Sequence, residues 1–258
     1  MSTMADVRIT PLGDHVTLVE LCRPPDNYMT VPFIGQIADA LETCQADGDT
    51  RTVVLAAEGK HFCAGAKLDP AERAAPGSAP PVHLYDHAVR IFASELPIVA
   101  AIQGAAVGGG LGVALSADFR VACPESRFTA NFARLGFHHG FGTTVSLPAV
   151  VGQQRALELL YTGRRIDGAE ALRIGLIDRL VPADQLRAEA VSFAREIAES
   201  GPLAVRAIRA TMRGHLAGAV KAATDHEKAE QDRLGRTADF AEGVRAMAER
   251  RTPRFSGR

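Results

Sequence analysis

The spacing of hydrophobic residues changes several times along this chain, and each change predicts a secondary-structure element. Val7–Thr10 and Val16–Leu21 alternate on either side of a Gly13-Asp14 turn, which predicts two paired strands. Apolar residues recur at helical spacing along Val31–Ala46. Thr52–Ala57 is a continuous apolar run, which is typical of a buried parallel strand.

The middle of the chain repeats this order of strand and helix. Pro97 separates a predicted helix, His83–Leu96, from an apolar strand, Ile98–Ile102. The elements expected next are a helix at Leu111–Ser116, strands at Asp118–Cys123 and Arg127–Thr129, helices at Thr143–Val150, Gln153–Tyr161 and Gly168–Ile174, and a strand at Leu176–Val181. The helices expected after Pro182 are Asp184–Glu199, Pro202–His215, Ala219–Arg233 and Ala238–Arg250. The pattern predicts an α/β core with a parallel sheet over residues 1–200 and a helical region over residues 201–258.

A strand, a turn and the start of a helix meet in residues 97–112, which read PIVAAIQGAAVGGGLG. Glycines allow close approach of the backbone, and a helix start offers unpaired N–H groups and the positive end of a dipole. This corner is therefore either a site for negative charge or a tightly packed turn without a ligand. It lacks the GxGxxG motif and the acidic ribose-binding residue of a Rossmann-type nucleotide site.

The composition and net charge of the chain disfavour some classes of binding partner. The chain has 258 residues, 47% hydrophobic and 23% charged, with a net charge of −1, which disfavours nucleic acid or a membrane surface as the main partner. No apolar run is long enough for a membrane span, and the N-terminus lacks a signal-peptide pattern. The four cysteines are scattered without a CxxC pair, which suits reduced thiols in a cytoplasmic protein.

Two stretches together, HFCAGAKL (residues 61–68) and PIVAAIQGAAVGGGLGVALSADFRVA (residues 97–122), resemble the enoyl-CoA hydratase/isomerase (crotonase) superfamily. Residues 147–182 and 239–255 also match, so the resemblance covers nearly the whole chain. It implies a crotonase fold, a ClpP/crotonase-like spiral of ββα units with C-terminal helices that form trimers or dimers of trimers (hexamers). It also implies a lyase or isomerase of the kind found in fatty acid metabolism, whose ligand is an acyl-CoA thioester. Coenzyme A would be part of the substrate, with no separate cofactor and no metal.

The resemblance also implies site residues. The backbone N–H groups of Ala66 and Gly109 match the oxyanion hole of the superfamily, which binds the thioester oxygen. Such donors stabilise the negative charge of an enolate more than that of the ground state. The other residues matched to substrate or CoA contacts are Arg23, Ala64, Lys67, Leu68, Gly108, Phe132 and Phe255.

The chain departs from the superfamily pattern at its proton-transfer residues. The hydratases that it resembles use two glutamates, and here these positions are Gly112 and Phe132. Addition of water by two carboxylates of different protonation is therefore in doubt. His138 and His139 lie in the same loop and could act as general acid or base, with His139 slightly favoured. Equally, these histidines could face solvent or bind loop carbonyls.

Several alternatives stay open at this point. Phe132 either packs in the core or indicates a bulky or aromatic acyl group, and no carboxylate between Asn131 and Gly152 could serve a covalent aspartate mechanism. His83 and His87 have the i, i+4 spacing of metal ligands but no third ligand is evident. The functional hypotheses are a hydratase-like enzyme, a C–C bond hydrolase or isomerase of a bulky or cyclic acyl-CoA, and a non-catalytic acyl-CoA-binding protein.

Overall fold

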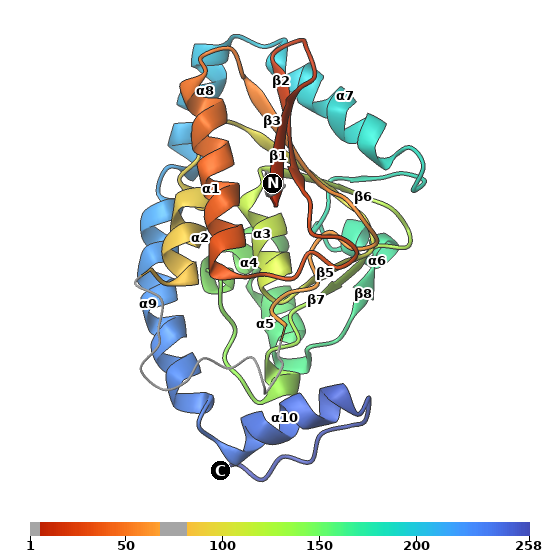
Figure 1. The fold of residues 1–258 in the computed structure, drawn as a ribbon, viewed down its shortest axis with the longest axis vertical. Coiled ribbons are helices and arrows are strands. Elements are labelled where there is room, and N and C mark those ends of the chain that lie inside the picture. The colour runs from red at the N-terminus through yellow and green to blue at the C-terminus, as the bar shows by residue number, and fades with distance from the viewer. Residues whose placement is uncertain (1–5, 68–81) are drawn as a thin grey trace, which may run out of the picture.

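Two sheets organise the molecule, which a computed structural model describes over residues 6–67 and 82–258 (Figure 1). In these ranges the larger sheet has the order β1-β2-β3-β4-β6-β9, with β1 antiparallel to β2 and the other neighbours parallel. The smaller sheet has the order β5-β7-β8. The strands are β1 (Val7–Pro11), β2 (Val16–Leu21), β3 (Thr52–Ala57), β4 (Ile98–Ile102), β5 (Ala105–Val107), β6 (Phe119–Ala122), β7 (Arg127–Thr129), β8 (Ile166–Asp167) and β9 (Arg179–Leu180).

Helices cover both faces of the larger sheet, α9 packs against α2 and α4, and α10 lies at the bottom of the view next to η2 (Figure 1). The helices are α1 (Val31–Ala46), α2 (Leu84–Phe92), α3 (Gly109–Ser116), the 3-10 turn η2 (Ala133–Leu135), α4 (Thr143–Val151), α5 (Gln153–Thr162), α6 (Gly168–Arg173), α7 (Leu186–Ala198), α8 (Pro202–Arg213), α9 (Leu216–Leu234) and α10 (Ala238–Ala248). The predicted α/β core with helices after it is confirmed. No helix in the described ranges is both long enough and apolar enough to cross a bilayer.

The continuous apolar run of β3 is explained by burial on both of its faces. Val53 and Leu55 point into a core shared with α1, α2 and α3, whereas Val54 and Ala56 point into a second core under α7. Since successive side chains of a strand alternate between faces, a strand between two helical layers must be apolar at every position. This sheet is the rigid support from which the site loops emerge.

Some element boundaries differ from the sequence-based expectation. The helix expected at His83–Leu96 ends at Phe92, and the strand expected at Leu176–Val181 is only Arg179–Leu180. In the second case the N–H of Leu176 donates to Ala171 O, so this residue closes helix α6 instead of joining the sheet. The glycine-rich helix begins at Gly109, two residues before the expected start.

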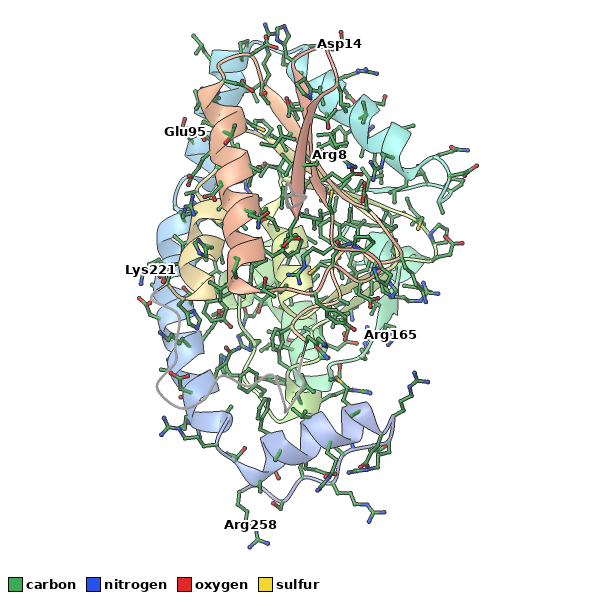
Figure 2. The ribbon with its side chains drawn as sticks, in the orientation of Figure 1. Arg8, Asp14, Glu95, Arg165, Lys221 and Arg258 are labelled. Carbon is green, nitrogen blue, oxygen red and sulfur yellow. The ribbon has the colours of Figure 1, made fainter. Side chains whose placement is uncertain are left out.

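An ion cluster anchors α8 to the core. The carboxylate of Asp118, only 8% exposed, lies 3.1 Å from Arg209 Nε and 3.0 Å from Arg213 Nε. It also accepts a 2.8 Å hydrogen bond from the backbone N–H of Ile98, at the start of β4. Many other charged side chains are exposed, and Figure 2 shows the labelled side chains of Asp14, Glu95, Lys221 and Arg258 pointing outward from the periphery.

Candidate active site

The site is built where the turn after β3 meets the start of α3. Cys63 N donates to Ala105 O, and Val107 N donates to Cys63 O, each at 3.0 Å. Cys63 therefore pairs with Ala106 of β5 as a parallel strand residue would, and this pairing holds the two turns side by side. On the other side of the first turn, Met29 N donates to Gly65 O at 2.9 Å.

Two glycines make this approach possible. A Cβ atom on Gly110 would lie 2.2 Å from the carbonyl oxygen of Cys63. Gly65 has a φ of +85°, and its Cβ would lie 2.8 Å from Val107 O. Both contacts are with backbone atoms, which cannot rotate away, so a larger residue at either position would force the turns apart.

The meeting of the turns leaves two amide groups available. Gly109 is the first residue of α3, so no carbonyl precedes it in the helix, whereas Gly108 N donates to Thr129 O at 2.9 Å. Within the described residues, no carbonyl accepts a hydrogen bond from the backbone N–H of Ala66 or of Gly109. Two such donors, one of them at a helix N-terminus, can together bind an oxygen that carries negative charge.

These amides border a cavity of about 680 Å³. Its lining is mainly apolar and contains five of the fourteen Phe and Tyr residues of the chain, although aromatic residues make up only 5% of the sequence. The lining residues are Tyr28, Met29, Ala64, Gly65, Ala66, Lys67, His83, Leu84, Tyr85, Val107, Gly108, Gly109, Asn131, Phe132, Leu135, Phe137, Gly140, Phe141, Gln231, Met247 and Ala248. No carboxylate is among these described lining residues.

Aromatic side chains fill the space beside Gly112, on helix α3, and beside Gly140, which lines the cavity. A Cβ atom on Gly112 would lie 2.6 to 2.8 Å from three atoms of Phe141, whose ring is fully buried. A Cβ atom on Gly140 would lie 1.8 Å from the hydroxyl oxygen of Tyr85. Gly112 is the position at which the resemblance expects a glutamate, and the ring of Phe141 occupies the room that such a side chain would need.

Tyr85 belongs to a hydrogen-bonded network that borders the cavity. The Tyr85 hydroxyl donates to Gln231 Oε1 at 2.7 Å, and Gln231 Nε2 donates to the carbonyl oxygen of His138 at 2.9 Å. Burial, together with the nearby Glu227 carboxylate, raises the pKa of the Tyr85 phenol. The side chain is therefore a neutral phenol at physiological pH.

His83 also lines the cavity and caps α2. Its Nδ1 accepts a 3.1 Å hydrogen bond from the backbone N–H of Tyr85, while its own backbone N–H donates to Asp86. Burial lowers the pKa of His83, which favours the neutral ring. Because Nδ1 is an acceptor, the proton of the neutral ring is on Nε2, and His83 can donate a hydrogen bond there but has no lone pair to accept one.

The structure brings most of the sequence-derived site residues together. The predicted residues that line the cavity are Ala64, Ala66, Lys67, Gly108, Gly109 and Phe132, and Tyr85 joins them. Leu68 lies outside the described residues. Arg23 is outside the lining and donates to Thr30 Oγ1 at 2.9 Å, and Phe255 is exposed near the C-terminus.

His138 and His139 do not line the cavity, so their position does not support proton transfer to a bound acyl group. The two rings stack with centroids 4.1 Å apart, and His138 Nδ1 donates to the carbonyl of His139. His139 Nε2 lies 2.9 Å from Thr144 Oγ1, which donates to the buried carboxylate of Glu227. Since the hydroxyl has only one proton, His139 Nε2 is the donor in this contact. His139 is thus linked through Thr144 to Glu227 of α9, whereas the His138 ring forms its hydrogen bond within the loop.

The metal hypothesis for α2 gains no support from the geometry. His87 packs against Gly35 and lies 3.1 Å from Arg90, a positively charged neighbour. Elsewhere in the described ranges, Glu20, Cys22 and Glu58 place possible ligand atoms within 4.8 Å of one another. The guanidinium of Arg8 pairs with both carboxylates of that group, and Arg187 pairs with Glu20, so two cationic side chains already balance its charge.

Sequence reasoning missed the contribution of the C-terminal helices to the cavity. Gln231 comes from α9, and Met247 and Ala248 come from α10. Helix α9 lies beside α2 and α4, and α10 is held over η2 by Phe240, whose ring centroid is 4.5 Å from that of Phe137 (Figure 1). No local pattern marks these residues, because only tertiary packing carries them to the site.

Comparison with known proteins gives a consistent picture. The family model "Enoyl-CoA hydratase/isomerase" matches residues 12–258. "Probable enoyl-CoA hydratase EchA14" of Mycobacterium tuberculosis is 36% identical over 233 residues, covering 89% of this chain and 90% of that protein. The 1,2-epoxyphenylacetyl-CoA isomerase of Escherichia coli is 30% identical over 87% of this chain and 88% of its own length. The crystal structure of an enoyl-CoA hydratase/isomerase from Pseudoalteromonas atlantica matches with a TM-score of 0.87 and 31% identity, over 97% of this chain and 100% of that one.

The contact between Gly112 and Phe141 leads to a first prediction, on stability. We expect Gly112→Ala to lower the free energy of unfolding by about 1–3 kcal/mol, because the new methyl group overlaps the Phe141 ring. In a Phe141→Gly background the same change should have almost no effect. Urea denaturation measures both, with Gly218→Ala as the control, since nothing lies within 4 Å of a Cβ atom at that position. Equal losses in the two backgrounds would contradict the steric explanation.

Burial of His139 leads to a second prediction, on pH. Burial first, and then His138 and His226, lower the pKa of His139 from 6.5 to about 4. The folded state therefore binds fewer protons than the unfolded state, and the free energy of unfolding should fall as the pH drops from about 6.5 to 4. His139→Gln should flatten this part of the profile in urea denaturation, whereas His215→Gln, on an exposed side chain, should not. Parallel profiles for the wild type and His139→Gln would refute the assignment.

Proposed function

The chain belongs to the enoyl-CoA hydratase/isomerase family, with the crotonase fold that its sequence resembles, and on this basis we propose a specific reaction class. The protein is an acyl-CoA-processing enzyme that stabilises a thioester enolate, nominally in a hydratase-like reaction. The single observation that carries this proposal is that the amides of Ala66 and Gly109, which no carbonyl of the described residues engages, lie on the wall of an apolar cavity.

The two amides fit the role of an oxyanion hole. When an enolate forms, negative charge moves onto the thioester oxygen, and fixed N–H donors lower the energy of that state more than of the ground state. The glycines at 65 and 110 fix these donors before any ligand binds. Removing one donor of this kind typically raises the activation barrier by about 3 kcal/mol.

The aromatic lining supports a bulky, cyclic or aromatic acyl group. Phe132, Phe137 and Phe141 offer ring faces and edges, and aromatic pairs gain about 0.5–1.5 kcal/mol beyond the burial of their area. The related protein of Escherichia coli is named for an epoxyphenylacetyl-CoA substrate, which also contains a ring. This favours isomerisation or C–C bond hydrolysis of a cyclic acyl-CoA as the alternative reaction on the same site.

The charged part of coenzyme A would lie at the mouth of the cavity. Lys67 follows Ala66 directly, is exposed and lines the entrance, so its ammonium group can approach the phosphates of a bound thioester. Arg23 lies on the adjacent loop and is the second candidate contact. Coenzyme A thus acts as part of the substrate, and the reaction needs no separate cofactor or metal.

The assembly we propose is a homotrimer, or a dimer of trimers, in the cytoplasm. Helix α8 has no buried side chain, and Leu203, Ile208 and Met212 are 82%, 63% and 68% exposed. Three large apolar side chains on one short helix are a typical interface core. All four cysteines are free thiols, as a reducing compartment would keep them.

This proposal gives a third prediction, on oligomeric state. The wild-type protein should have the molar mass of three or six chains in light scattering. Ile208→Asp should reduce that mass, because it buries a charge in the contact. Exposed Tyr161→Phe, on α5, serves as the control and should leave the mass unchanged. A wild-type protein that is a monomer at every concentration would overturn the assembly.

The fourth prediction concerns turnover. Incubation with crotonyl-CoA and with cinnamoyl-CoA, followed by enone absorbance and product mass, should show conversion, and faster conversion of the aromatic thioester. Gly110→Ala should lower kcat/KM by about 100-fold or more, because its Cβ would lie 2.2 Å from Cys63 O and separate the two amides. Gly218→Ala, with open space around it, is the matched control. Tight binding of both thioesters without any change in either would favour the non-catalytic acyl-CoA-binding protein.

A further inference from the structure

Tyr85 is the most buried ionisable side chain among the described residues that line the cavity. The other ionisable side chains of that lining are Tyr28 and Lys67, which are exposed, and His83, which is half-buried. Tyr85, its hydrogen-bond partner Gln231 and the neighbouring Gly140 all border the cavity. The phenol therefore belongs to the wall that a bound acyl group would touch.

The position of the hydroxyl is fixed by the residues around it. Gln231 Oε1 accepts its hydrogen bond at 2.7 Å, and the amide of Gln231 is itself held by the His138 carbonyl. A Cβ atom at residue 140 would lie 1.8 Å from the hydroxyl oxygen and 2.6 Å from Gln231 Nε2. The glycine at 140 is thus a requirement for this placement.

The other polar groups of the described cavity wall are poorly suited to protonate a carbon atom. The pKa of His83 is lowered, so its ring is neutral. That ring can donate a hydrogen bond only from Nε2, because Nδ1 accepts one from the backbone N–H of Tyr85. Lys67 lies at the exposed mouth, next to Ala66, where the phosphates of coenzyme A would be. Asn131 and Gln231 carry amides, which do not exchange a proton readily at neutral pH.

We propose that Tyr85 is a catalytic residue that delivers a proton to the α-carbon of the thioester enolate. The inference rests on the proposed function. In the addition of water, the Tyr85 hydroxyl turns its single proton from Gln231 Oε1 toward the α-carbon, and the O–H bond breaks as the C–H bond forms. The water oxygen bonds to the β-carbon, and a proton of that water passes to the phenolate. The sum is one water added to the double bond, and Tyr85 ends as the phenol it was.

The surroundings of the hydroxyl agree with a donor that is charged only briefly. Burial and the Glu227 carboxylate raise the pKa of the phenol, so the resting enzyme holds the proton. The backbone amide of Phe141 lowers the pKa of the phenol and so favours its ionised form. A phenolate that forms for one step is thus met by a fixed N–H dipole.

The test compares Tyr85→Phe with Tyr161→Phe in the intact protein. The chain has only three tyrosines, and Tyr161 is 75% exposed, so the second variant removes an equal hydroxyl away from the site. With cinnamoyl-CoA, Tyr85→Phe should lower kcat by about 100-fold or more while KM changes little. Tyr161→Phe should keep wild-type values. A Tyr85→Phe enzyme as active as the wild type overturns the inference and leaves the proposed function intact.

A second pair of variants separates catalysis from packing. Gly140→Ala should lower both stability and kcat, because its methyl group displaces the hydroxyl. Adding Tyr85→Phe removes the closest overlap, so the double variant should regain stability in urea denaturation but not activity. If activity returns together with stability, Tyr85 has only a structural role and the inference is wrong. A wild-type protein that binds thioesters but converts none overturns the proposed function, and this inference with it.

Discussion

The close approach of two backbone turns is the constraint on which the rest of the site depends. Cys63 must pair with the edge of β5 for the amides of Ala66 and Gly109 to border the same cavity. That pairing is possible only with glycine at 110, where a methyl group would meet a carbonyl oxygen. The sheet beneath, buried on both faces, prevents either turn from shifting to relieve such a contact. The site is therefore preorganised by backbone sterics, and the side chains add selectivity to it.

The cavity combines two fixed backbone donors with an aromatic wall and no carboxylate among its described residues. In such surroundings a developing enolate is stabilised strongly, because the donors do not have to reorient. The same surroundings would raise the pKa of any buried acid, and Tyr85 is an example. A phenol is consistent with this environment, since it is neutral at rest and needs no counter-ion. The proton transfer and the substrate binding that we propose thus make compatible demands on one apolar wall.

Much of the fold follows from local sequence signals. The helix Val31–Ala46 and the strand Thr52–Ala57 were predicted with the bounds observed, because periodicity and burial coincide there. The turn containing Ala66 was found through a family resemblance, and the corner at residues 97–112 through its cluster of glycines. The histidine pair was proposed as a possible general acid or base because histidine titrates near neutrality, but neither residue lines the cavity, and His139 contacts Thr144 of α4. Gln231 was not predicted, because its place in the cavity wall depends on how α9 packs against the core. Chemical type can be inferred from sequence more readily than orientation.

The fit between Gly112 and Phe141 also limits how this protein can have diverged. An acidic side chain at residue 112 cannot be accommodated while the ring is present, and loss of the ring alone leaves a void next to α3. Neither single change is tolerated well, although the pair together is geometrically sound. The two positions are therefore epistatic, and a lineage that adopted the aromatic filling cannot return to a carboxylate by single neutral steps. The packing contact between residues 112 and 141 thus restricts how the chemistry of the cavity can change during evolution.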